Sequence, residues 1–264
     1  MASAYLEFIR IRFLTMLAYR VNYYSGIVIY SLNIGVYYFL WKAIYGDASQ
    51  LGGFSAAQIT TYVAVSWMAR SFYYNNLDRE IANEIRDGSV AIQMIRPYSY
   101  LLVKFMQGFG EGLFRLVMFM LPGLVVVMLL FPLDLPKEPW RWAVFFLMIL
   151  FSFLINSQIN LLTGMIAFWL ENNQGVISFK RVMVDLFSGV VLPISFFPGW
   201  ARTVLEWLPF QAIAYLPGSA FTGTLSGSEV VFAIGIQAVW SVALILPIML
   251  MWRAARRRMF VQGG

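Results

Sequence analysis

Apolar residues in this chain gather in long runs, and the charged residues lie mostly between them. The first run, 21–41, holds 21 residues without a charge. At about 1.5 Å per residue a helix of this length covers the roughly 30 Å hydrocarbon core of a bilayer. The pattern therefore predicts an all-α polytopic membrane protein forming one transmembrane domain over 1–264. Its six transmembrane helices are expected at about 21–44, 58–76, 113–131, 142–170, 180–197 and 230–252.

Residues 1–20 are expected to form an amphipathic helix in the membrane interface. Arg10 and Arg12 lie inside the apolar stretch, and no small-residue cleavage site follows, so a cleavable signal is excluded. An extension of the first span is the alternative. The expected apolar face consists of Tyr5, Leu6, Ile9, Phe13, Met16 and Leu17, with Glu7 opposite.

The densest charge cluster lies between the second and third spans, at 77–97. At helical spacing Leu77, Ile81 and Ile85 share one face, and Gly88 is a good helix stop. A second short helix should run to Ile95. The cluster is either a solvated linker or a docking element for a soluble partner. Its charged residues are Asp78, Arg79, Glu80, Glu84, Arg86 and Asp87.

The next segment, 98–131, can form one long helix. Its length exceeds one bilayer thickness, so its start should project from the membrane or lie along the surface. The charged residues Lys104, Glu111 and Arg115 all fall in its first half.

Prolines break the chain before the last span. Pro193, Pro198 and Pro209 prevent one straight helix. We expect a re-entrant segment, with an external helical part at 198–210 that Trp200 and Trp207 anchor. The following stretch, 212–227, is rich in Gly, Ser and Thr and is expected to be an external loop.

Four polar residues within the predicted spans are candidates for a transport pathway: Arg70, Asn156, Asn160 and Asp185. A charge at the centre of a span costs about 2.5–3.5 kcal/mol on insertion scales, which snorkelling or pairing reduces. Polar groups in spans usually form hydrogen bonds across helices. A role in a transport pathway and a role in hydrogen bonding between helices both stay open for these four residues.

Composition agrees with the membrane assignment. Of the 264 residues 60% are hydrophobic and only 12% are charged, against about 25% charged in soluble proteins. Cysteine and histidine are absent, which excludes disulfides, thiolate or histidine catalysis and the usual zinc sites. We therefore expect no catalytic residue, no metal and no bound cofactor.

The net charge of +6 does not indicate a nucleic-acid partner, because the basic residues lie at the ends of apolar runs. With both termini inside, 14 of the 19 basic residues fall on the inner side and 4 on the outer side. The positive-inside rule then places 77–97 in the cytoplasm. The chain carries no phosphate-binding motif, so it should not hydrolyse ATP itself.

In the order and spacing of several short motifs, the sequence resembles the permease subunits of type-2 ABC transporters. The small six-span branch is the most similar. The matching residues are Tyr19-Arg20, LWKAIYG at 40–46, EIRDG at 84–88, Arg96-Pro97, AFW at 167–169, Ser188-Gly189, Pro193, FPGW at 197–200, LPF at 208–210, Arg258 and Gly263-Gly264.

The resemblance implies a multi-pass protein of the bacterial plasma (inner) membrane, paired with an identical or homologous permease. Two cytoplasmic ATPase subunits would use ATP and Mg and drive export of an amphipathic or apolar substrate. By resemblance, the coupling helix would comprise Arg79, Glu80, Ile81, Glu84, Ile85, Arg86, Asp87 and Gly88. The re-entrant gate would comprise Pro193, Phe196, Phe197, Pro198 and Trp200.

Two other classes of protein compete with this interpretation. A self-contained secondary transporter or channel would more often place paired acids or a histidine at the midplane. Here Asp185 is the only acid within a predicted span. A membrane-embedded enzyme would need an Asp pair or a Ser-Lys pair in the bilayer, and the sequence shows no such pair.

Overall fold

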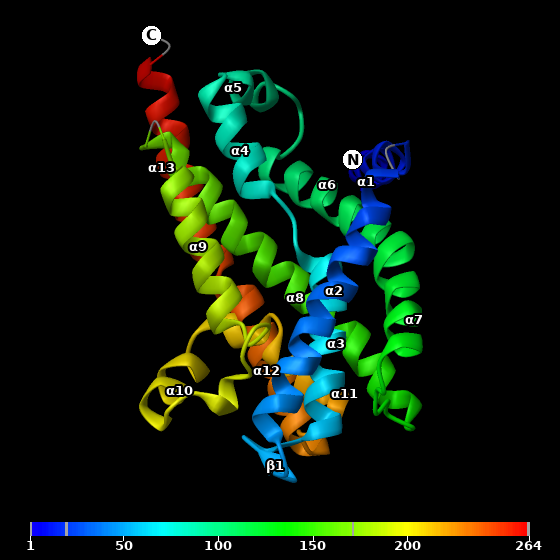
Figure 1. The fold of residues 1–264 in the computed structure, drawn as a ribbon. Helices are drawn as coiled ribbons and strands as arrows, with labels where there is room; N and C mark the ends of the chain where they lie inside the picture. The colour runs from blue at the N-terminus through cyan, green and yellow to red at the C-terminus, as the bar shows by residue number, and fades with distance from the viewer. Residues whose placement is uncertain (1, 19–20, 171, 263–264) are drawn as a thin grey trace.

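The computed structural model describes residues 2–18, 21–170 and 172–262, and this part of the chain is almost wholly helical (Figure 1). This confirms the all-α membrane fold. Four residues of the resemblance, Tyr19, Arg20, Gly263 and Gly264, lie outside the described residues. The first elements are α1 (Ala2–Ala18), α2 (Val21–Tyr45), β1 (Gln50–Leu51), β2 (Phe54–Ser55), α3 (Ala56–Tyr73), α4 (Leu77–Arg86), α5 (Ser89–Met94) and α6 (Tyr100–Arg115).

The elements that follow are η1 (Leu116–Met120), α7 (Leu121–Leu130), α8 (Pro139–Met165), η2 (Ile166–Phe168), α9 (Gln174–Phe187), η3 (Ile194–Phe196), α10 (Gly199–Glu206), η4 (Pro209–Ala212), α11 (Tyr215–Thr222), α12 (Gly227–Ala243) and α13 (Ile245–Gln262). Figure 1 places α4, α5 and the C-terminal end of α13 at one end of the molecule. The short hairpin and α10 lie at the other end.

Helix α3 is the centre of the core. Ser55 starts it with a capping box: Ser55 Oγ accepts from the Gln58 amide at 3.2 Å, and Gln58 Oε1 accepts from the Ser55 amide at 2.9 Å. Fourteen of its residues are buried, because α2, α6, α7, α8 and α11 all pack around it. Phe72, for example, packs against Phe153 of α8 with ring centroids 5.6 Å apart.

Four helical segments of the described chain are long and apolar enough to cross a membrane: Ser25–Tyr45, Tyr100–Leu130, Pro139–Phe168 and Gly227–Arg258. Helix α3 is not among these four segments; it contains Arg70 and is surrounded by other helices of the bundle. Helix α9 has only 14 residues, which is about 21 Å and shorter than the hydrocarbon core. The count of six spans therefore stays a prediction.

The expected long helix at 98–131 is present as α6, η1 and α7. A π-helical turn at Leu116–Met120 joins the two α-helices, and Figure 1 shows α6 and α7 inclined to each other. Helix α1 packs along α6, where Gly110 permits close approach, since a Cβ there would lie 2.4 Å from Ile9 O. Leu6 does not belong to the packed face of α1, because it is 64% exposed.

The prediction of an external loop at 212–227 is wrong for most of that stretch. Helix α11 occupies Tyr215–Thr222, and six of its eight residues are buried between α3 and α8. A Cβ on Gly218 would lie 2.6 Å from Tyr62 Cε2. The small residues here allow close helix packing, which the sequence pattern alone does not distinguish from a flexible loop.

Candidate functional site

The charged stretch at 77–97 folds as two short helices, α4 and α5, joined by a tight turn. Asp78 and Glu80 in the first turn of α4 favour the positive end of the helix dipole. Gly88 ends the helix with φ 77°, a backbone conformation that glycine adopts at little cost. The Asp87 carboxylate then accepts from the Ser89 amide at 2.9 Å and from its hydroxyl at 2.6 Å, which lowers the pKa of Asp87.

The apolar face of α4 packs against the protein itself. Leu77 and Ile81 are buried, at 2% and 0% exposure, and α4 lies mainly on α8 and η2. Gly164 of α8 makes this contact possible, since a Cβ there would lie 2.9 Å from Ile81 Cβ and 3.0 Å from Asp78 O. Ile81 is therefore not available to a partner, and Ile85 is half-buried.

Ion pairs fix α4 to the helices around it. Asp78 Oδ2 lies 2.8 Å from Lys180 Nζ of α9. Glu84 is paired with Lys104 of α6 and accepts from the Tyr100 hydroxyl at 2.6 Å. Asp78 and Glu84 are thus engaged within the chain and do not face a partner.

Arg12 connects α1 to both α4 and α6. It pairs with Glu80 of α4 and with Glu111 of α6, the second contact at 2.7 Å. Burial acts to lower the pKa of Arg12, but the two carboxylates outweigh it and raise the pKa. Glu111 also binds Arg115. Helix α1 and the charged helix α4 are therefore parts of one assembly.

The turn between α4 and α5 and the end of α5 form the free surface of this unit. Ile92 is 61% exposed and Ile95 is 84% exposed, and Figure 1 shows α5 at the extreme end of the molecule. Val90, by contrast, is buried beside Ile81. We call the exposed residues the α4–α5 tip; they are Asn83, Arg86, Asp87, Gly88, Ala91, Ile92, Ile95, Arg96 and Pro97.

The four candidate pathway residues all have partners within the protein. Arg70 pairs with Asp185 and lies over the rings of Trp67 and Tyr74. Asn156 Nδ2 donates to Tyr73 O at 2.8 Å. Asn160 Nδ2 donates to Asn75 Oδ1 at 2.7 Å and its Oδ1 accepts from Lys180 at 2.5 Å. Asp185 is the most accessible of them, with 31% of its side chain exposed.

The predicted gate residues lie at the end opposite α4. Pro193 and Pro198 flank the short turn η3, and Pro198 is followed directly by α10. Phe196 packs against Trp41 at 4.8 Å and against Phe54 at 6.4 Å between ring centroids. This segment is thereby held against the hairpin and the end of α2, while Trp200 is 77% exposed.

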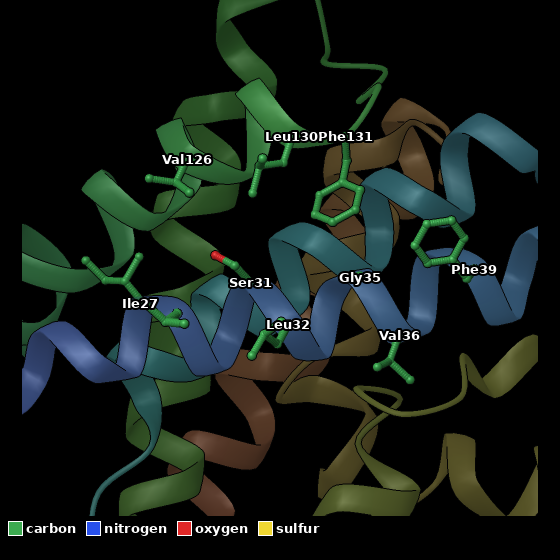
Figure 2. A pocket seen from close by; sticks show the side chains of 10 residues that line it. Ile27, Ser31, Leu32, Gly35, Val36, Phe39, Val126, Leu130 and Phe131 are labelled. Carbon is green, nitrogen blue, oxygen red and sulfur yellow. The ribbon is translucent and has the colours of Figure 1, made fainter.

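An open apolar groove of about 660 Å³ runs between α2 and α7 (Figure 2). Ser31 supplies the one side-chain hydroxyl of its lining, so the groove suits an apolar occupant. The other lining residues are Ile27, Val28, Leu32, Gly35, Val36, Phe39, Val126, Leu130 and Phe131.

Sequence reasoning missed three residues of this site. The charge of Lys180 does not by itself indicate its partners, although its place five residues before Asp185 puts both on one helix. Likewise, the charge of Arg12 within an apolar stretch does not indicate that it meets Glu80 and Glu111. Asn75 lies at the junction of α3 and α4 and carried no signal in the pattern of charges.

A helical bundle that carries four apolar helices long enough to cross a membrane, together with a charged, protruding helix pair, defines a polytopic membrane protein. The family model described as ABC-2 family transporter protein matches residues 31–263. The chain belongs to this family and is a permease subunit of an ABC transporter, which implies an ABC ATPase as partner. No curated protein matched the sequence.

Proposed function

We propose that this chain couples ATP hydrolysis by separate cytoplasmic ATPase subunits to the outward movement of an amphipathic or apolar substrate. Two copies, or one copy and a homologous permease, would form the transport unit in a bacterial plasma membrane. The 14 to 4 distribution of basic residues supports cytoplasmic termini and a cytoplasmic α4.

The observation that carries this proposal is the division of α4 and α5 into an embedded side and a free side. Asp78, Glu80 and Glu84 bind α9, α1 and α6, so a force applied at α4 reaches three other helices. Ile92 and Ile95 present apolar side chains beyond that assembly. A rigid-body movement of a docked ATPase would then be passed into the bundle.

The apolar groove between α2 and α7 supports the choice of substrate class, because its lining offers little to a polar molecule. A self-contained secondary transporter or channel is the alternative that the sequence left open, and membership of the ABC-2 family disfavours it. It would need no ATPase and would use an ion gradient instead.

To test this proposal, the tagged full chain is purified from native membranes. The vanadate-sensitive ATP hydrolysis of the proteins that co-purify with it is then measured. Ile95→Asp should reduce the co-purifying activity several-fold, because it places a charge in the docking surface, and Ile95→Leu should leave it unchanged. Glu84→Arg and Gly88→Pro should also reduce it. However, Glu84→Arg breaks an internal ion pair, so Ile95 is the cleaner site.

Equal ATPase recovery with Ile95→Asp and with the wild type would remove the docking role of the tip. Transport by the purified chain alone, driven by an ion gradient, would establish the competing function.

A further inference from the structure

Helix α10 exposes an apolar stripe at the end of the molecule opposite α4. Trp200 is 77% exposed, Val204 is 56% exposed, and Trp207, directly after the helix, is 78% exposed. At 3.6 residues per turn these three positions lie within about 60° of one another around the helix axis. A cluster of large apolar side chains exposed to this degree marks an interaction surface.

The rest of the α10 circumference divides into two further faces. Leu205 is buried at 4% exposure and holds the helix to the protein. Arg202 and Glu206 are exposed on the other side, where Arg202 Nε lies 2.8 Å from Glu206 Oε1, and the exposed Thr203 lies between Glu206 and Trp207 around the helix axis. One face thus meets the protein, one is polar, and one is apolar. A helix that lies in the plane of a bilayer interface shows this division of polar and apolar faces.

The position of α10 agrees with such an interface. Phe196, three residues before the helix, packs on Trp41 near the end of α2, and α2 contains the candidate span Ser25–Tyr45. Phe197 packs on Phe187 at the end of α9, with ring centroids 6.4 Å apart. Figure 1 shows α10 to one side of the bundle, near the end of α9 that is remote from α4. Helix α10 therefore begins at the level where a membrane span ends.

We propose that Trp200, Val204 and Trp207 insert into the lipid headgroup and acyl boundary of the leaflet opposite α4. Tryptophan is enriched at this depth because its ring is apolar and its indole N–H reaches polar groups. The bordering Arg202–Glu206 pair favours lipid over a second copy of the chain, since headgroups and water solvate both charges, whereas a protein contact across the stripe would desolvate them. The inference is independent of ATP coupling.

The absence of cysteine from the sequence makes a direct test simple. Trp200→Cys, Val204→Cys and the polar-face control Arg202→Cys are each made in the full chain, spin-labelled, and reconstituted in phosphatidylcholine and phosphatidylglycerol vesicles. Collision rates with oxygen and with a water-soluble nickel chelate are then measured. The ratio of oxygen to nickel accessibility should be several-fold higher at 200 and 204 than at 202.

Ratios at 200 and 204 equal to that at 202 would place the stripe in water. Low accessibility to both reagents would place it against protein, such as a second copy, and either result overturns the proposal. Quenching of tryptophan fluorescence by brominated lipid gives a second measurement without cysteine. The Trp200→Phe/Trp207→Phe variant should lose part of the quenched signal, and an unchanged quenched signal would also overturn the proposal.

Discussion

Lys180 Nζ on α9 lies 2.8 Å from Asp78 Oδ2 on α4. Five residues further along α9, Asp185 pairs with Arg70 of α3. Only Ile177 and Val184 of α9 are buried, so apolar packing contributes little to its position. The two ion pairs, which reach different neighbours, hold α9 to the bundle and connect it to the charged helix.

Breaking the Asp78–Lys180 pair from one side should destabilise the protein. The Asp78 side chain is only 4% exposed and that of Lys180 is 16% exposed, so Asp78→Asn leaves a buried ammonium group with its charge uncompensated. Removing one partner of such a pair costs about 3–5 kcal/mol, which corresponds to a fall in Tm on the order of 5–10 °C. Thermal unfolding in detergent measures it.

The double variant Asp78→Asn/Lys180→Met should recover part of that loss, because neither charge is then left alone. If the losses in Tm of Asp78→Asn and of Lys180→Met simply added in the double variant, the pair would not interact energetically.

Gly164→Ala should displace α4, since the new Cβ would meet Ile81 Cβ at 2.9 Å and the backbone of Asp78 at 3.0 Å. We expect a loss of about 1–3 kcal/mol, the usual cost of overpacking. Gly175→Ala is the matched control, because a Cβ there meets nothing within 4 Å. Chemical denaturation compares the two variants, and equal stability would contradict the close contact between α4 and α8.

Arg12→Met should loosen α1 from α4 and α6, because it removes both ion pairs that Arg12 makes. Hydrogen bonds to charged groups contribute about 1.5–3 kcal/mol each, less here because the Arg12 side chain is 24% exposed. Hydrogen exchange in α1 should become faster. Arg10→Met is the control, since its pair with Glu7 is largely exposed, and it should have almost no effect.

The raised pKa of Arg12 also fixes the sign of its pH dependence. Its contribution to stability is fully present at every pH below the ordinary arginine pKa and is lost only as pH rises toward the raised pKa of Arg12. Arg12 itself should therefore add no pH dependence to stability in the neutral range.

Gly52→Ala should disturb the segment that holds α10. Gly52 and Gly53 both have positive φ, at 57° and 84°, so alanine strains the backbone at either position. Only at Gly52 would the new Cβ also meet Phe196, at 2.8 Å from its ring. Gly52→Ala should therefore cost more than Gly53→Ala in thermal unfolding, and equal losses would show that Phe196 moves away freely.

The local pattern of the sequence determined several of the helices and some of their ends. Uncharged runs located the helices α2 and α8, Gly88 located the end of α4, and the prolines at 193 and 198 located the break before α10. These features depend on nearest neighbours along the chain, on helical period and on backbone stereochemistry, all of which the sequence contains directly. The family resemblance followed from the same short motifs and is confirmed over residues 31–263.

Only the tertiary structure decided which surfaces are free. Ile81 and Ile95 read as similar apolar positions in one amphipathic stretch, yet Ile81 is 0% exposed and Ile95 is 84% exposed. The small residues of α11 read as a loop, although they allow that helix to pack between α3 and α8. Lys180 and Asp78 are 102 positions apart in the sequence. Contacts of this kind depend on how the helices pack. The spacing of residues along one helix does not indicate which other helix will pack against it.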